Sequence, residues 1–195
     1  MKKVLFCFFI FFMVINIWGQ DEGRREIRGS AGFGFRFSGD FHASVNYQNT
    51  AIFDTGLYAY GDFIFIELLC GMFFGTAQGK LNYLGAELGL YGKYPFGVTE
   101  KINIFPLLGF EFHSALYARY FGVQFRKREP DWKQFWFKTG AGLDYKINDS
   151  LNLRFEALYG IRPKSIGGNI LENGADIVIN DKTGHGLTFR IAIGF

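Results

Sequence analysis

Apolar and polar side chains alternate along most of the chain beyond residue 27. The pattern is clearest in the last ten residues, where one parity holds only large apolar side chains: Leu187, Phe189, Ile191, Ile193 and Phe195. The other parity holds glycine, threonine, arginine and alanine. Successive side chains point to opposite faces of a β-strand, so this period predicts a terminal strand with one apolar face.

The same period of two divides the chain into eight extended segments. They cover residues 28–37, 52–60, 62–74, 81–94, 102–115, 134–147, 151–161 and 186–195. The third segment is apolar on both sides of Glu67, so a bulge, a strand against an apolar patch and a buried helix all remain open there. Short joins near 60–62, 96–101 and 148–150 alternate with long joins at 38–51, 118–133 and 162–185, and the short 76–80 join is the exception.

Charged residues within these segments share a face with the glycines. They are Arg36, Glu87, Lys93, Glu111, Lys138, Asp144, Arg154, Glu156 and Arg190. Five cations and four anions predict an ion-pair network that fills a lumen, since unpaired buried charges are costly and eight strands enclose just enough space for side chains. A soluble calycin-like barrel would instead have an apolar lumen and a polar exterior. We therefore predict an all-β fold, a closed eight-stranded antiparallel transmembrane β-barrel with up-and-down meander topology.

Aromatic residues near the segment ends predict two girdles, because rings with one polar and one apolar side favour membrane interfaces. One girdle would contain Tyr94, Phe96, Tyr145 and Phe195. The other, at the opposite end, would contain Tyr117, Tyr120, Phe121, Trp136 and Tyr159.

The N-terminus has the features of an export signal. Lys2 and Lys3 precede an apolar run over residues 4–17, and Gly19 offers a small residue at a cleavage point before Gln20. The run is too short to span a membrane, which takes about 20 residues; a buried core helix is the alternative. We predict a signal peptide at 1–19 and a barrel domain at 20–195. Cleavage would leave Cys70 as the sole cysteine, so an intramolecular disulfide is excluded.

The mature chain would have little net charge. The formal charge of +3 falls to about +1 without the two leader lysines, and no basic stripe is present. These features exclude a nucleic-acid-binding protein.

The leader, the length, the eight alternating segments and the terminal Phe195 together resemble the small bacterial outer-membrane barrels of the OmpX, OmpW and OmpA-transmembrane type. The resemblance implies a location in the cell outer membrane after signal cleavage. It implies that Phe189, Ile191, Ile193 and Phe195 form the signal read by the outer-membrane assembly machinery. It also implies contact with outer-membrane lipid and lipopolysaccharide or its equivalent, a monomeric state, and short joins on the periplasmic side.

Candidate catalytic residues are few. His42-Ala43-Ser44 matches the His-x-Ser pair of PagL-type lipid A deacylases, but it lies near the first strand rather than late in the chain. Glu111 and His113 share a face, and Ser114 lies on the other. Residues 20–27 are too short and too charged for the N-terminal helix of PagP-type palmitoyltransferases. Three scattered histidines and one cysteine do not make a ligand set. We predict no catalytic, cofactor or metal site.

Three functional hypotheses remain. The first is a non-catalytic barrel whose extracellular loops contact a ligand or a host surface. The second is an OmpW-like conduit for small apolar molecules, and the third is a PagL-like deacylase. Residues 162–185 mix asparagine and aspartate with isoleucine and valine, which could extend the seventh and eighth strands as a protruding hairpin. The basic segment 126–133 could pair with lipopolysaccharide phosphates.

Overall fold

The computed structural model describes residues 29–45, 48–63, 65–77, 81–120, 123–124, 133–163, 169–172, 175–178 and 183–195. The predicted signal peptide lies outside these residues. Eight long strands are present: β1 (Ala31–Val45), β2 (Gln48–Phe63), β3 (Ile66–Ala77), β4 (Leu81–Lys93), β6 (Ile102–Tyr120), β8 (Lys133–Asn148), β9 (Leu151–Arg162) and β12 (Gly184–Gly194). Among the described residues, no helix is long and apolar enough to cross a membrane.

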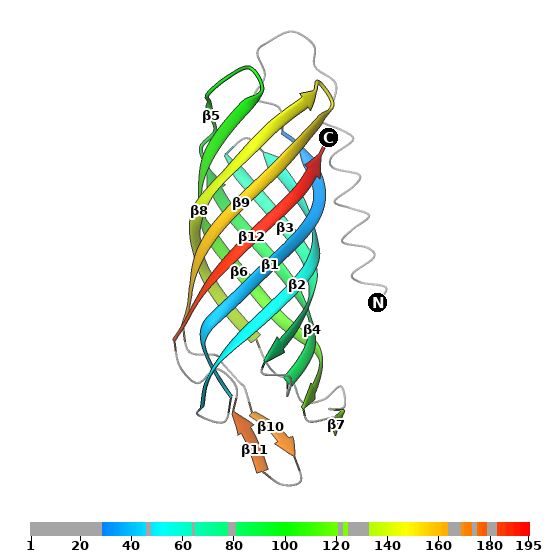
Figure 1. Cartoon of the computed structure of the whole chain (residues 1–195), viewed down its shortest axis with the longest axis vertical. Coiled ribbons are helices and arrows are strands. Elements are labelled where there is room, and N and C mark those ends of the chain that lie inside the picture. Colours follow the sequence, from blue (N-terminus) through cyan, green and yellow to red (C-terminus); the bar gives the residue numbers. More distant parts are fainter. Residues whose placement is uncertain are drawn as a thin grey trace.

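The eight long strands form one closed antiparallel barrel (Figure 1). Each strand pairs with the next in the chain, β4 pairs with β6, and β1 pairs with β12 to complete the ring. Two short strands, β5 (Phe96–Gly97) and β7 (Val123–Gln124), pair with the two ends of β6. The predicted eight-stranded up-and-down meander is confirmed.

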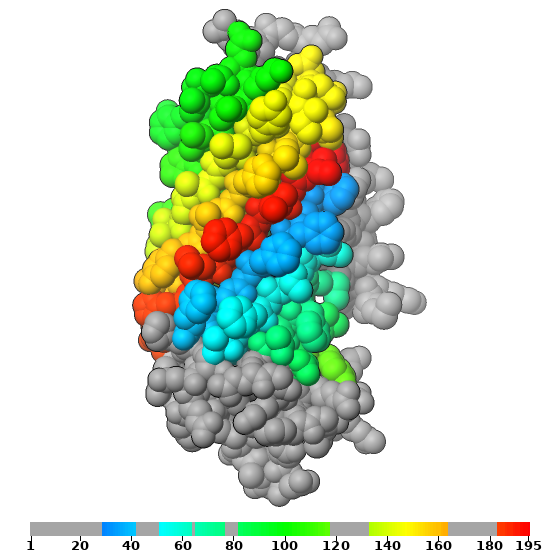
Figure 2. All heavy atoms as spheres, in the orientation of Figure 1, coloured from blue at the N-terminus to red at the C-terminus, as the bar shows by residue number. Residues whose placement is uncertain are grey.

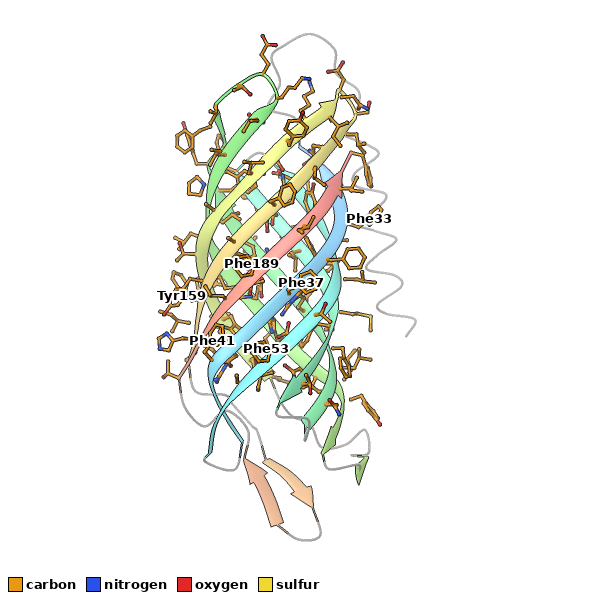
Figure 3. The ribbon with its side chains drawn as sticks, viewed as in Figure 1. Phe33, Phe37, Phe41, Phe53, Tyr159 and Phe189 are labelled. Carbon is orange, nitrogen blue, oxygen red and sulfur yellow. The ribbon has the colours of Figure 1, made fainter. Side chains whose placement is uncertain are left out.

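Side-chain parity separates the outer wall from the lumen, as predicted. Phe33, Phe35 and Phe37 are 60%, 59% and 52% exposed, whereas Arg36 between them is fully buried. Phe33, Phe37, Phe41, Phe53, Tyr159 and Phe189 lie on the outer wall of β1, β2, β9 and β12 (Figure 3). The space-filling view shows β12 and β1 side by side, with their side chains covering the wall continuously (Figure 2). The barrel is therefore apolar outside.

The first two strands are longer than predicted, and the predicted loop over 38–51 is wrong. β1 and β2 remain paired through the predicted loop as far as Val45 and Gln48, and a register shift between Asp40 and Ala43 marks a β-bulge. Ser38, Gly39 and Asp40 suggest a turn by composition. In the strand, however, Asp40 points into the lumen while Gly39 lies beside the Phe41 and Phe53 rings.

The predicted join at 60–62 is also wrong. Gly61 pairs with Leu68 inside the sheet, and the Asp62 amide donates to the Ser30 carbonyl at 2.7 Å. The strand therefore runs to Phe63, and β3 begins at Ile66. The helix alternative for this apolar stretch is excluded, because β3 alternates between outward Ile66 and inward Glu67 as any barrel strand does.

The two ends of the barrel differ. The C-terminus, the β8–β9 turn and β5 lie at one end, and β10 (Asn169–Glu172) and β11 (Ala175–Val178) lie at the other (Figure 1). β10 and β11 form a hairpin that is a separate two-stranded sheet, rather than the predicted extension of the neighbouring barrel strands.

The first predicted girdle lies on the outer wall: Tyr94, Phe96, Tyr145 and Phe195 are all exposed. At the opposite end Tyr117 and Tyr159 are also exposed, whereas Phe121 and the Tyr120 side chain lie outside the described residues. Trp136 is a wrong assignment. It shares parity with Lys138, so it points into the lumen and is buried.

Candidate functional site: the charged lumen

The interior of the barrel is filled mainly by charged and aromatic side chains, with smaller clusters that include the aliphatic Leu69, Leu107 and Leu158 between them. The largest fully enclosed side chains include Arg36, Arg154, Arg162 and Arg190. The nine charged residues predicted to face inward all lie on the inner wall: eight are buried, and the side chain of Asp144 is 15% exposed. Enclosed charges at this density must be paired, because an isolated ion is costly to remove from water.

Glu111 on β6 is the centre of the network. Its carboxylate contacts Arg190 and accepts a hydrogen bond from the Tyr91 hydroxyl. Lys138 Nζ lies 2.6 Å from Glu111 Oε2, and His113 Nε2 lies 2.8 Å from the same oxygen. Glu111 and His113, which share a face as expected, are thus hydrogen-bonded, and β4, β6, β8 and β12 are joined at one carboxylate.

Arg154 on β9 organises the end of the lumen nearer the C-terminus. Its guanidinium donates to Glu67 at 2.7 Å, to Asp144 at 2.7 and 2.8 Å and to Asp62 at 2.9 Å. Asp62 also pairs with Lys93. The guanidinium carbon lies 4.1 Å from the centre of the Tyr60 ring, so a cation–π contact covers its remaining face.

Arg36 on β1 organises the opposite half. It pairs with Asp54 and Glu87, and Glu87 in turn lies 3.4 Å from His113 Nε2. His113 thereby links this group to Glu111, and Glu156 links Glu111's partner Arg190 to Arg154. The ion pairs form one connected network in which each of the eight long strands contributes at least one side chain.

A separate pair lies at the end of the lumen that carries the β10–β11 hairpin. Arg162 Nε donates to Asp40 Oδ2 at 3.2 Å, joining β9 to β1 across β12. The guanidinium of Arg162 also lies 5.6 Å from the Trp136 ring centre. Charged and aromatic side chains thus occupy the lumen at this level as well as at its centre.

Glycines provide the room for these large groups. A side chain at Gly142 would overlap the Phe105 ring, and one at Gly75 would overlap the Tyr83 ring. Small residues opposite large ones are how narrow barrels are filled. This explains why the glycines share the inward parity with arginines.

Five charged lumen residues were not among the predicted positions: Asp40, Asp54, Asp62, Glu67 and Arg162. The pattern places Asp40 and Arg162 in joins and Asp62 at the edge of one. Asp54 lies near the start of the second segment, and Glu67 lies in the third segment, whose two faces the pattern leaves open. The parity of Arg36 and Arg154, carried forward along β1 and β9, would have found Asp40 and Arg162.

Three donor groups lie near enough to share a metal ion. Side-chain atoms of Glu87, Glu111 and His113 lie within 4.8 Å of one another. Both carboxylates, however, already contact Arg36, Lys138 or Arg190, and these cations would repel a metal ion. The donor set is therefore a poor fit to a metal.

The described residues offer little support for a hydrolase site. His113 is buried in the lumen, whereas the neighbouring Ser114 lies on the outer side. The side chains of His42 and Ser44 lie outside the described residues. Tyr159 and His185 form a 2.6 Å hydrogen bond on the outer wall.

Solved structures that resemble this barrel identify its fold. Neisserial surface protein A shares 8% identity with a TM-score of 0.57, covering 86% of this chain and 97% of that one. Ail of Yersinia pestis shares 12% identity with a TM-score of 0.41, covering 86% of this chain and 98% of that one. OprG of Pseudomonas aeruginosa shares 11% identity with a TM-score of 0.43, covering 85% of this chain and 93% of that one. No protein-family model and no curated protein matches the chain. The similarity to the first structure shows that the chain has the fold of a small outer-membrane barrel.

The network predicts a large cost for losing one cation. Replacing Arg190 by Met keeps an unbranched side chain but leaves Glu111 and Glu156 short of a partner, so we expect unfolding in urea to be easier by about 3–5 kcal/mol. The matched control is Lys146→Gln, which removes an exposed pair with Asp149 and should cost at most about 1 kcal/mol. Equal effects of the two changes would contradict a buried network.

Proposed function

We propose that this protein is a non-catalytic integral outer-membrane barrel with a closed, charge-filled lumen, whose extracellular loops contact a ligand or a host surface. The observation that carries the proposal is the polarity of the barrel, which is apolar and aromatic outside and ion-paired inside. That is the reverse of a soluble barrel, and it suits a wall that faces lipid.

Several features of the outer wall support a position in a membrane. Large hydrophobic side chains are exposed on all eight long strands, and an apolar surface of this extent is uncommon on a soluble monomer. The long strands have 11–19 residues, against about 9–11 needed for a tilted crossing. The rings of Phe65 and Tyr94 stack with centroids 5.8 Å apart, and Tyr94 and Phe96 are 4.9 Å apart. Such a cluster suits a headgroup interface.

The lumen argues for a closed barrel and against the alternative of an OmpW-like conduit. A conduit for small apolar molecules needs an open, apolar path. Here Arg36, Arg154 and Arg190 cross the interior, and the Arg162–Asp40 pair lies at one end. The apolar stretch around residues 63–74 also turns Phe63, Ile66 and Met72 outward.

The absence of an assembled nucleophile and base in the described lumen favours a binding role over a PagL-like deacylase. Loops on a rigid scaffold commonly carry binding. We assign the end with the β10–β11 hairpin to the outside and the end with the C-terminus to the periplasm. At the outside, the segments 126–133 and 162–185 would meet lipopolysaccharide or a host ligand.

The terminal strand supports recognition by the outer-membrane assembly machinery. Phe189, Ile191, Ile193 and Phe195 point outward in a row along β12, which is the strand that meets β1 at the closure of the barrel. We propose that this row is the assembly signal and that the folded barrel acts as a monomer.

The closed lumen predicts an absence of channel activity. The purified barrel in planar bilayers should show no discrete conductance steps under conditions in which a water-filled porin shows them. A steady open-channel conductance would contradict the proposal of a closed lumen and favour the alternative of a conduit.

The terminal aromatic predicts an assembly defect. Phe195→Asp places a charge on the apolar row, so the variant should accumulate in the periplasm and lose heat-modifiable migration. Thr183→Asp, an exposed change outside the row, is the control. A wild-type amount of the Phe195 variant in the outer-membrane fraction would contradict the role of this residue in the assembly signal.

The loop assignment predicts that binding can be removed without unfolding the barrel. Excision of residues 167–181 should preserve heat-modifiable migration and reduce adhesion of expressing bacteria to cultured host cells at least tenfold. Excision of residues 126–131 tests the contribution of the basic loop separately. Adhesion that survives both excisions would contradict a loop-borne function.

A further inference from the structure

The lumen network has more acids than bases. Among the described residues, the connected network holds five lysines and arginines: Arg36, Lys93, Lys138, Arg154 and Arg190. It holds seven carboxylates: Asp54, Asp62, Glu67, Glu87, Glu111, Asp144 and Glu156. If every carboxyl group were ionised and the His113 imidazole that links Glu87 to Glu111 were neutral, the enclosed network would carry two uncompensated negative charges, which is a costly state in a low-dielectric interior.

The surplus is concentrated around Arg154. This one guanidinium lies within 3 Å of Asp62, Glu67 and Asp144, and within 3.9 Å of Glu156. Lys93 neutralises Asp62, and Arg190 is shared between Glu156 and Glu111. The cations at this level therefore cannot neutralise all four acids.

Three carboxylate oxygens in this group have no hydrogen-bond partner among the described residues: Asp62 Oδ1, Glu67 Oε1 and Glu156 Oε1. Asp62 is compensated through its other oxygen by both Lys93 and Arg154, so the two glutamates are the less compensated acids. Glu67 Oε2 and Glu156 Oε2 are held by Arg154 and Arg190 at 2.7 and 2.9 Å. The second oxygen of each, Glu67 Oε1 and Glu156 Oε1, is buried and accepts no hydrogen bond, and the buried Tyr58 hydroxyl is also unpaired. A proton on one of these oxygens removes a charge and creates a donor for a neighbouring acceptor.

The groups that face Glu67 and Glu156 come from every neighbouring strand. They are Tyr58, Tyr60 and Asp62 on β2, Tyr91 and Lys93 on β4, Glu111 on β6, Asp144 on β8, Arg154 on β9 and Arg190 on β12. The nearest network cation on β1, Arg36, is engaged by Asp54 and Glu87. None of these groups is a further cation that could offset the surplus.

We propose that the folded lumen binds at least one proton on the Glu67–Glu156 pair at neutral pH, which makes the stability of the barrel sensitive to pH. The inference rests on the closed lumen of the proposed function, and it concerns regulation of the scaffold rather than the loops. In mild acid the pair is protonated and the network is balanced; in alkali the proton is lost and the lumen carries the surplus.

The sign of the effect follows from linkage. The unfolded chain exposes both glutamates to water, where they are ionised above about pH 5, so the folded state holds more protons than the unfolded state. Stability must then fall as pH rises, and one extra proton corresponds to about a tenfold change in the unfolding equilibrium constant per pH unit. Ordinary paired carboxylates give the opposite sign, since they lose stability in acid.

The test is urea unfolding of the folded barrel in lipid vesicles from about pH 5 to about pH 9, without divalent cations. The wild-type barrel should lose stability toward alkali. Glu67→Gln and Glu156→Gln mimic the neutral acid in shape and supply a donor, so each should flatten this slope and match or exceed wild-type stability in alkali. Glu100→Gln is the matched control: Glu100 is exposed in the turn between β5 and β6, outside the network, so this variant should keep both the stability and the slope of the wild type.

A second measurement does not depend on the variants. Refolding the wild-type barrel in weakly buffered medium near pH 7 with an indicator dye should show net proton uptake. Flat stability without proton uptake would overturn the proposal. Stability in alkali that depends on added magnesium or potassium would also overturn it, because a bound cation would then carry the compensation. Either failure, with a non-conducting barrel, would leave the proposed function standing.

Discussion

The constraint on which the structure depends is that charged side chains enclosed in a narrow barrel must find partners inside it. Eight strands enclose a lumen that side chains alone can fill. Here the filling is mostly arginine, glutamate, aspartate and tyrosine. Each guanidinium is both a space-filling group and a connector, as Arg154 shows by contacting acids on β2, β3 and β8. Polar pairing thus replaces the apolar core that a soluble domain of this size would have.

This arrangement makes the barrel cooperative across its width. Backbone ladders join each strand only to its two neighbours, whereas the network joins strands across the lumen. Arg190 on β12 meets Glu111 on β6, and Arg154 on β9 meets Glu67 on β3. On the outer wall, the described ring contacts, such as Phe65 with Tyr94 or Phe110 with Phe135, join neighbouring segments rather than opposite sides of the barrel. In a lipid environment, cross-barrel cohesion would come from the lumen.

Parity made the inner and outer walls predictable from the sequence. A slip of one residue would reverse every assignment on a strand, so the alternation on β9 and β12 fixed the inward positions of Arg154, Glu156 and Arg190. Strand ends were harder to predict, because Ser38, Gly39 and Asp40 have turn composition yet continue the strand. The Arg162 partner of Asp40 comes from β9, and the Phe53 ring beside Gly39 comes from β2, so neither can be seen in the local sequence.

The charge balance also depended on residues that the sequence pattern did not assign. Nine predicted positions gave five cations and four anions, which suggested a nearly neutral lumen. Asp54, Asp62 and Glu67 join the network in the structure, and they change it to an acidic one. The prediction for Trp136 failed for a different reason. Its place in the alternation puts its side chain in the lumen, and this outweighs the preference of an aromatic ring for the membrane interface. The acids that contact one arginine come from strands brought together when the barrel closes, so the local sequence does not reveal them.

The central claim is that the arginines are enclosed and paired. Nitrogen-15 NMR of the arginine side chains in lipid nanodiscs tests it most directly, because guanidinium protons exchange rapidly with water unless they are buried and hydrogen-bonded. Signals assigned by substitution to Arg36, Arg154 and Arg190 should be resolved, with slow proton exchange. Collapsed, rapidly exchanging signals from these three residues would mean a water-filled lumen and would contradict the account.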